Sequence, residues 1–295
     1  MLDPGANRPR SSLVRWGDLV RRTARAVSED DCLGGAGELA YFWFLALFPG
    51  LLFVGALAAY LPVQHLLGPA MQALASVAPG GVLVMVREQL RQITHERHLG
   101  LLMMSFLGAL WSSSSGMTAM IAMVNQAHHA KDERSWWRVR VLAIALTCAA
   151  ASLAVVAVVL TLAGSRLAPQ VAKIPGGSTL VWSWRIARWP LIFGLFVTAL
   201  EWIYYFGSDV PRRRASITPG SIAAATLALL LSCGLKWYAF YVGHYQATYG
   251  TIGGVIVVLL WLYGSGLAIL IGAELNAAVE NTPAVRSVET SAPSG

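Results

Sequence analysis

Charged residues are scarce in this sequence. Only 13% of its 295 residues are Asp, Glu, Lys or Arg, and 56% are hydrophobic. An average soluble domain carries about 25% charged residues. The scarcity of charge excludes an ordinary cytosolic enzyme and a disordered chain, and it favours an integral membrane protein.

Cysteines and catalytic motifs are also sparse. Three cysteines are too few for a disulfide framework. The sequence has no glycine-rich phosphate loop, no nucleophile elbow and no Cys-x-x-Cys pair. Its six histidines are not joined by carboxylates or cysteines at zinc-like spacing. We therefore predict no catalytic residues, no metal and no cofactor, so the sequence argues against an enzyme.

What the sequence has instead is long stretches without charge. A membrane-crossing helix needs about 20 apolar residues, because each adds about 1.5 Å across a hydrocarbon layer about 30 Å thick. The stretches are too continuously apolar for barrel strands, in which polar and apolar residues alternate. The sequence predicts an all-α, polytopic integral membrane protein with six transmembrane helices, at residues 38–61, 100–125, 140–163, 188–207, 218–243 and 251–279.

Residues 66–86 are also apolar and could form a seventh crossing. Pro69 and the Pro79-Gly80-Gly81 triplet would break a helix there. We therefore expect a surface-lying or re-entrant segment, followed by a short amphipathic helix at about residues 82–96.

Basic residues are distributed unevenly around the predicted spans. The N-terminal segment, the second-to-third and fourth-to-fifth connections and the C-terminal tail hold 14 of the 22 Lys and Arg residues, and the opposite side holds 7. Because cytoplasmic flanks are enriched in Lys and Arg, we expect both termini to be cytoplasmic.

The same pattern predicts three parts of the chain. Residues 1–35 form a cytoplasmic, basic, amphipathic N-terminal segment, residues 36–280 the six-helix transmembrane domain, and residues 281–295 a disordered cytoplasmic tail. Within the first part, residues 13–27 are either an interfacial helix on anionic headgroups or a simple topology signal.

Four ionisable residues lie inside the predicted spans: Glu38, Glu201, Lys236 and Glu274. Each costs about 2.5–3.5 kcal/mol at mid-membrane on insertion scales, so each is a functional candidate. We expect the three acids near the cytoplasmic ends, where they are either hydrated or, with Asn276, couple transport to ions or protons. Lys236 either snorkels to the outer surface or binds the headgroup of an anionic substrate.

Uncharged polar residues add further candidates. The serines of the second span are either helix-packing residues that hydrogen-bond between helices or the wall of a hydrated cavity. Tyrosines near the outer interface either anchor the protein or contact substrate. The candidates for substrate binding are Lys236, Ser112, Ser113, Ser115, Asn125, Tyr245, Thr248 and Tyr249.

Backbone features also stand out within the first and last spans. Pro49 should kink the first helix. Gly264, Gly266 and Gly272 contribute to a small-residue packing face on the last helix.

Specific strings in the chain resemble a known family. They are Glu-Leu-Ala-Tyr-Phe at 38–42, Leu-Trp-Ser-Ser-Ser-Ser-Gly at 110–116, the segment Tyr-Gln-Ala-Thr-Tyr-Gly-Thr-Ile-Gly-Gly at 245–254 and Gly-Ala-Glu-Leu-Asn at 272–276. Over residues 33–280 the chain resembles the YihY / virulence factor BrkB family of bacterial inner-membrane proteins. It departs from the family's commonest pattern at Glu38 and Gly50.

The resemblance implies a multi-pass protein of the bacterial plasma (inner) membrane, with six helices and both ends cytoplasmic. It also implies that the family's older ribonuclease BN label is a misassignment. Some members are linked to envelope integrity, and some resemble envelope-lipid transporters. We therefore expect a transporter or flippase-like protein for an amphiphilic, anionic envelope molecule such as a lipid.

The alternative is a non-transporting envelope-integrity scaffold that binds lipids or partner proteins. Membrane lipids are the predicted partners, with other envelope proteins and a homo-oligomer left open. No nucleic acid is expected, because the basic residues lie beside the spans and form no groove-sized patch.

Overall fold

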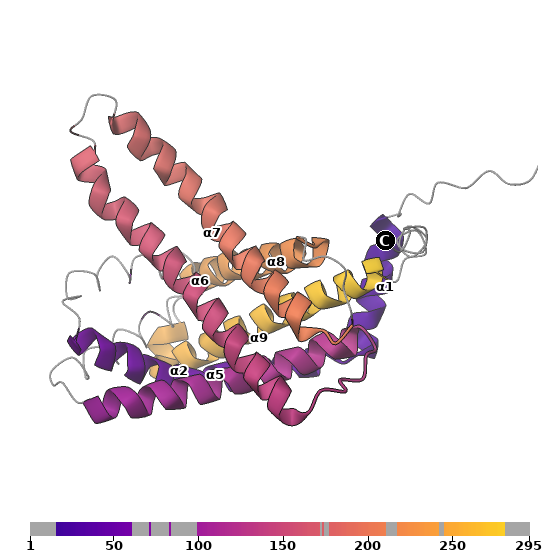
Figure 1. The fold of residues 1–295 in the computed structure, drawn as a ribbon. Helices are drawn as coiled ribbons and strands as arrows, with labels where there is room; N and C mark the ends of the chain where they lie inside the picture. Colours follow the sequence, from indigo (N-terminus) through magenta and orange to yellow (C-terminus); the bar gives the residue numbers. More distant parts are fainter. Residues whose placement is uncertain are drawn as a thin grey trace, which may run out of the picture.

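The computed structural model describes residues 16–60, 71, 83, 99–171, 173, 177–210, 217–241 and 245–280. The regular elements in these residues are all α-helices, which confirms the all-α prediction (Figure 1). They are α1 (Trp16–Glu29), α2 (Cys32–Tyr60), α5 (Leu99–Ala127), α6 (Trp136–Val171), α7 (Gly177–Gly207), α8 (Pro219–Tyr241) and α9 (Tyr245–Glu280).

Six of these helices, α2 and α5 to α9, are long and apolar enough to cross a membrane. The predicted number of spans is therefore confirmed. The largest difference in bounds is at the fourth span, which was expected from residue 188, whereas α7 begins at Gly177. Arg185 interrupts the apolar pattern, but its side chain lies on the exposed surface of α7. A long basic side chain can reach polar surroundings from there without ending the helix.

Residues 66–86 lie outside the described residues, apart from positions 71 and 83. A surface-lying or re-entrant segment there stays a prediction, as does the amphipathic helix at 82–96.

The basic N-terminal segment contains a helix, as its pattern predicts. α1 packs against α9 and α2. It buries Leu19, which is only 3% exposed, whereas Arg21, Arg22 and Arg25 lie on its exposed face. A tight turn with Asp31 at φ 48° separates α1 from α2. The first membrane-length helix therefore begins at Cys32, within the segment expected to precede it.

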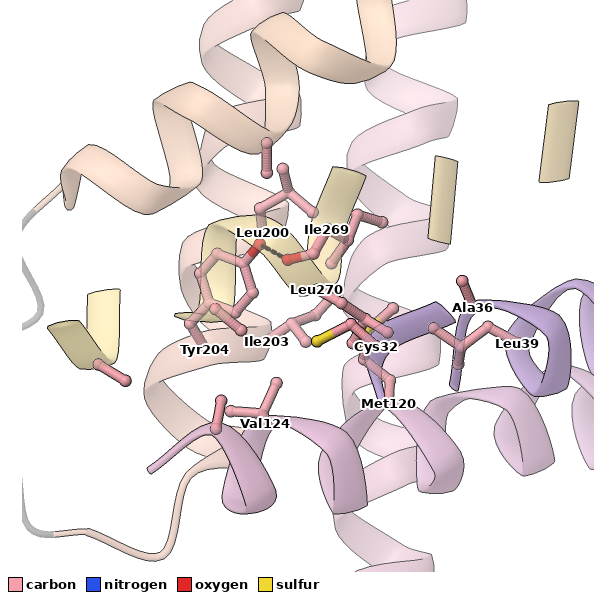
Figure 2. Close-up of a cluster of buried hydrophobic side chains, with 14 of the residues drawn as sticks. Cys32, Ala36, Leu39, Met120, Val124, Leu200, Ile203, Tyr204, Ile269 and Leu270 are labelled. Carbon is pink, nitrogen blue, oxygen red and sulfur yellow. Dashed lines mark hydrogen bonds between the residues drawn. The ribbon is translucent and has the colours of Figure 1, made fainter. Parts of the chain in front are cut away.

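The core lies where α2, α5, α7, α8 and α9 meet. Leu39, Met120, Leu200, Tyr204 and Leu270 are each at most 2% exposed and pack in one cluster (Figure 2). Relative to exposure to water, burial of each such side chain is worth about 1.5–3 kcal/mol.

Glycines let these helices approach closely. A Cβ on Gly266 would lie 3.4 Å from the Leu39 Cβ, and one on Gly272 would lie 2.6 Å from the Gly220 carbonyl oxygen. The predicted small-residue face of the last helix is therefore confirmed at these positions. Pro49 lies inside α2, and a Cβ on Gly108 of α5 would lie 3.4 Å from its side chain.

The pair α6 and α7 is less enclosed than the rest. The two helices run side by side, and their far ends project from the other helices (Figure 1). The early part of α6 packs on α5 through Ala143 and Leu146 against Ile121. Further along, α6 leaves Val155 61% exposed and Val159 54% exposed. An apolar surface of this extent fits the hydrocarbon of a bilayer.

Candidate functional site

The most unusual side chain in the described residues is Arg140, near the start of α6. Its Nη1 donates to the Ser115 hydroxyl oxygen at 3.2 Å, and its Nη2 donates to the Trp111 carbonyl oxygen at 3.1 Å. Its guanidinium also lies 4.0 Å from the centre of the Trp111 ring, a cation–π contact. Because Trp111 and Ser115 lie near the middle of α5, the charge sits well inside the helix bundle.

Arg140 is buried but incompletely paired. The residue is 8% exposed. Its Nε, like the nearby Ser112 hydroxyl, is a buried polar atom without a hydrogen-bond partner in the described part of the chain. Among the described residues, no carboxylate forms a salt bridge with Arg140. A buried charge is costly unless it is paired, so this arrangement marks a site that an anion could complete.

Sequence reasoning missed Arg140, because it was counted among the basic residues that flank a span. A signal was present. Trp136 and Trp137 precede it, and aromatic residues of this kind mark the membrane interface. A helix that begins at the tryptophans places Arg140 one turn inside the membrane-length segment.

A pocket of about 420 Å³ lies against the second half of α5. It is bounded by the end of α5, the turn that follows and the start of α6. The lining residues are Thr118, Ile121, Ala122, Asn125, Gln126, His129, Ala130, Lys131, Asp132 and Val139.

A helix cap shapes the wall of this pocket. His129 has a φ of 49°, the left-handed conformation. Its N–H donates to the Gln126 carbonyl at 2.8 Å, and the Ala130 N–H donates to the Asn125 carbonyl at 3.0 Å. This pair of bonds is the Schellman arrangement, in which glycine is the usual left-handed residue. The cap ends α5 and turns the chain so that Lys131 lines the pocket.

Asn125, a predicted substrate contact, lines the pocket but is also a joint between helices. Its amide nitrogen lies 3.2 Å from the Gly207 carbonyl at the end of α7, and its oxygen accepts from the Asp209 N–H at 2.7 Å. The same nitrogen donates to Asp132 at 3.2 Å. These bonds tie α5 to α7 and leave Asn125 little capacity for a ligand.

An ion pair reinforces this joint. Arg134 donates to both carboxylate oxygens of Asp132 at 2.8 Å, and its Nη2 donates to the Gly207 carbonyl at 2.7 Å. Hydrogen bonds from Arg134 hold the pKa of Asp132 below its ordinary value. Arg134 also lies 3.5 Å from Asp209, so its charge is shared between two carboxylates.

Two of the four predicted ion-coupling residues, Glu201 and Asn276, lie where α7, α8 and α9 meet, whereas Glu274 of α9 faces α2. Asn276 accepts from the Gly220 N–H at 2.8 Å and donates to the Thr218 hydroxyl at 2.9 Å. That hydroxyl donates to Glu201 at 2.7 Å. Glu274 accepts from the Cys32 thiol at 3.6 Å. Glu201, Glu274 and Asn276 are 6%, 3% and 1% exposed.

The structure does not gather the remaining candidates at one point. Glu38 lies on the exposed face of α2. Lys236 is half-buried on α8, and the residue is not free of interactions. Ser113 is half-buried on α5. The residues Tyr245, Thr248 and Tyr249 belong to α9, and their side chains lie outside the described part of the structure.

A metal centre does not form among the described residues. No three His, Cys, Asp or Glu side chains in that part of the chain are grouped so that they could hold a metal ion.

Six membrane-length helices around these buried polar groups define a multi-pass α-helical membrane protein. The chain belongs to the virulence factor BrkB family, whose model matches residues 23–294. This agrees with the resemblance seen in the sequence. No solved structure matches the chain.

Relatives support the family and the membrane location. A Bacillus subtilis protein with a ribonuclease-like name is 34% identical over 249 residues, covering 82% of this chain and 88% of the relative. A membrane protein of Alkalilimnicola ehrlichii is 25% identical over 278 residues, covering 91% of this chain and 60% of the relative. One from Vibrio campbellii is 34% identical over 96 residues, covering 31% of this chain and 29% of the relative.

The chain thus spans less than two thirds of the last two relatives. Both carry the name UPF0761 membrane protein, which states a location and no activity.

Proposed function

We propose that this protein moves an anionic amphiphile, such as a lipid, across the membrane in a flippase-like manner. The observation that carries the proposal is Arg140, a buried cation beside the middle of α5 with an unpaired Nε. Intramembrane charges are costly and usually mark a substrate or ion pathway. An anionic headgroup would compensate the charge of Arg140 and accept a hydrogen bond from its free N–H.

The surroundings of Arg140 suit an amphiphile better than a soluble anion. Trp111, which lies under the guanidinium, is 62% exposed, and Val141, next to Arg140, is 64% exposed. In a bilayer both side chains would meet lipid. A lipid could therefore place its headgroup against Arg140 and Ser115 while its acyl chains remain in the hydrocarbon.

Glu274, which accepts a hydrogen bond from Cys32 of α2, fits a supporting role in this scheme. Protonation of the buried Glu274 carboxylate would change the hydrogen bond from Cys32 that joins α9 to α2. Such a change could bias the packing of these helices and couple transport to a proton gradient. Lys236 remains a second candidate for headgroup contact.

The proposed orientation places both termini and the turn between α5 and α6 on the cytoplasmic side. That turn carries Lys131 and Arg134, and Arg138 follows within the first turns of α6. This is the sign of charge expected on cytoplasmic connections.

Reconstitution tests the proposal directly. Liposomes containing the purified protein and a fluorescent phosphatidylglycerol should expose the label of the inner leaflet to an external quencher faster than protein-free liposomes do. The same assay with fluorescent phosphatidylcholine should give a slower rate, because this headgroup has no net negative charge. Rates equal to those of protein-free liposomes would contradict transport and favour the scaffold. Equal rates for the two lipids would contradict recognition of an anion.

A further inference from the structure

The pocket between the end of α5 and the start of α6 presents an exposed cation. Lys131 lines it and is exposed. Asp132 lines it too, but Arg134 contacts both of its carboxylate oxygens at 2.8 Å. Arg134 also lies 3.5 Å from Asp209, so the two carboxylates share one guanidinium. Lys131 is the exposed ammonium that lines the pocket, and His129 lines it beside Lys131.

The position of the pocket along the membrane is marked by aromatic residues. Trp136 and Trp137 follow within a few residues, pack edge to face with ring centres 4.6 Å apart, and are 59% and 70% exposed. Exposed tryptophans at the end of a membrane-length helix anchor that end at headgroup level. The pocket therefore opens where lipid headgroups lie.

The two ends of the pocket differ in chemistry. Lys131 and His129 lie at the turn, whereas Ile121, Ala122 and Val139 line the side toward the helix bodies. A polar end next to an apolar end is complementary to a molecule with a charged head and a hydrocarbon tail. A free anion would leave the apolar side unused.

The pocket also leads toward Arg140. Val139, which lines it, immediately precedes Arg140, and Thr118, which lines it too, is one turn of α5 from Ser115. Residues three or four apart share one face of a helix. A headgroup in the pocket would thus lie on the α5 face that carries the Arg140 contacts.

We propose that this pocket is a loading site where an anionic lipid of the adjoining leaflet binds before it meets Arg140, with Lys131 as the cationic contact for its phosphate. This inference rests on the proposed function and names the place where substrate is collected. The exposed Lys131 captures the headgroup, and the more deeply buried Arg140 receives it.

Photo-cross-linking in nanodiscs tests the loading site. A photoreactive amino acid replaces Ala122, which lines the pocket and is exposed. The nanodiscs contain equal amounts of phosphatidylglycerol and phosphatidylcholine, and mass spectrometry identifies the lipid attached to the full-length protein. Phosphatidylglycerol adducts should predominate. The same photoreactive group at Val155, on the exposed far part of α6, is the positional control and should show no preference.

A matched pair of lysine variants tests the cationic contact. Lys131→Gln should lower the phosphatidylglycerol preference at position 122 about fivefold, the usual worth of one basic residue near an anionic surface. Lys173→Gln, at an exposed lysine between α6 and α7, should leave the preference unchanged. Equal adducts with both lipids, or equal losses in both variants, would overturn the inference. So would competition by inorganic phosphate in detergent, because it would indicate a site for soluble anions.

Failure of the loading site can be separated from failure of transport. Arg140→Leu should lower the translocation rate at least about tenfold and keep the adduct at position 122. A wild-type protein that forms the adduct but translocates nothing would contradict the proposed function alone. Normal translocation without any preference at position 122 would contradict the loading site alone.

Discussion

Two polar regions of this membrane protein differ in how completely their buried atoms are paired. At the junction of α7, α8 and α9, Asn276 hydrogen-bonds to Gly220 and Thr218, and Tyr204 donates to the Ile269 carbonyl at 2.7 Å (Figure 2). Between α5 and α6, the Arg140 Nε and the Ser112 hydroxyl lack partners in the described residues.

This difference separates a structural region from a candidate binding region. A buried polar group that has all its hydrogen-bond partners stabilises a single arrangement of the helices. A buried polar group that lacks hydrogen-bond partners lowers the stability of the fold. We infer that the junction holds the fold together and that the Arg140 region is kept for a ligand. The predictions below test this contrast.

The largest effect is expected from adding a methyl group at the junction. In Gly272→Ala the new Cβ would lie 2.6 Å from both the Gly220 carbonyl oxygen and the Tyr204 hydroxyl. Because one of these atoms is backbone, α8 and α9 must separate. We expect a loss of about 3 kcal/mol, measured as a lower melting temperature of the detergent-solubilised protein.

Gly234→Ala is the matched control, because in the described residues a Cβ on Gly234 of α8 would meet no atom within 4 Å beyond its own helix backbone. It should keep or raise the melting temperature, since alanine favours a helix by about 1 kcal/mol. Equal melting temperatures for the two variants would show that the junction is not tightly packed.

The next largest effect is expected at Asn276. Asn276→Leu leaves the Gly220 N–H without its acceptor inside the bundle. Such an unpaired buried group costs about 1–3 kcal/mol, which unfolding in increasing denaturant concentrations can measure. Thr226→Ala serves as control, because Thr226 is exposed and its hydroxyl bonds to Ile222 of its own helix. A variant as stable as this control would contradict a structural role for Asn276.

Arg140 should behave in the opposite way. Arg140→Leu removes a buried cation that has no carboxylate partner in the described residues, and replaces it with an apolar side chain. Stability should stay within about 1 kcal/mol of the wild type or increase. Denaturant unfolding beside Asn276→Leu measures the contrast directly. If Arg140→Leu is the less stable of the two, Arg140 is part of the structural framework.

The smallest effect concerns the joint between α5 and α7. The pKa of Asp132 is lowered in the folded protein, so its ion pair stabilises the fold at pH above the ordinary aspartate value of about 4. That contribution is lost as the pH falls through the lowered pKa. Asp132→Asn should therefore reduce stability at neutral pH by less than about 1 kcal/mol, because the residue is exposed.

Melting temperatures from neutral pH down to pH 3 would check the effect of Asp132. The wild-type and variant curves should converge at the acidic end. A constant difference over the whole range would show that the carboxylate charge is not responsible.

The sequence predicted the helical architecture well, because the length of an apolar run limits how a chain can cross a membrane. It also found Glu201, Glu274 and Asn276, since polar residues stand out within such runs. It could not show that Thr218 joins Asn276 to Glu201, because α7, α9 and the connection before α8 meet only in the folded bundle.

Arg140 escaped prediction for a related reason. Counting basic residues treats each one near a span as a mark of orientation. Whether such a side chain faces water or another helix depends on where that helix starts and how it crosses its neighbour. The contacts of Arg140 with Trp111 and Ser115 arise from the packing of α6 across α5, which no residue spacing reveals.

We infer that Arg140 serves transport, whereas the junction serves stability. The most direct test is the initial rate of phosphatidylglycerol translocation per reconstituted molecule, compared between Arg140→Leu and Arg138→Leu. Arg138 is exposed on the same helix, two residues away. The account predicts at least about a tenfold loss for Arg140→Leu, from the lost charge-assisted hydrogen bond, and an unchanged rate for Arg138→Leu. Equal rates in the two variants would contradict it.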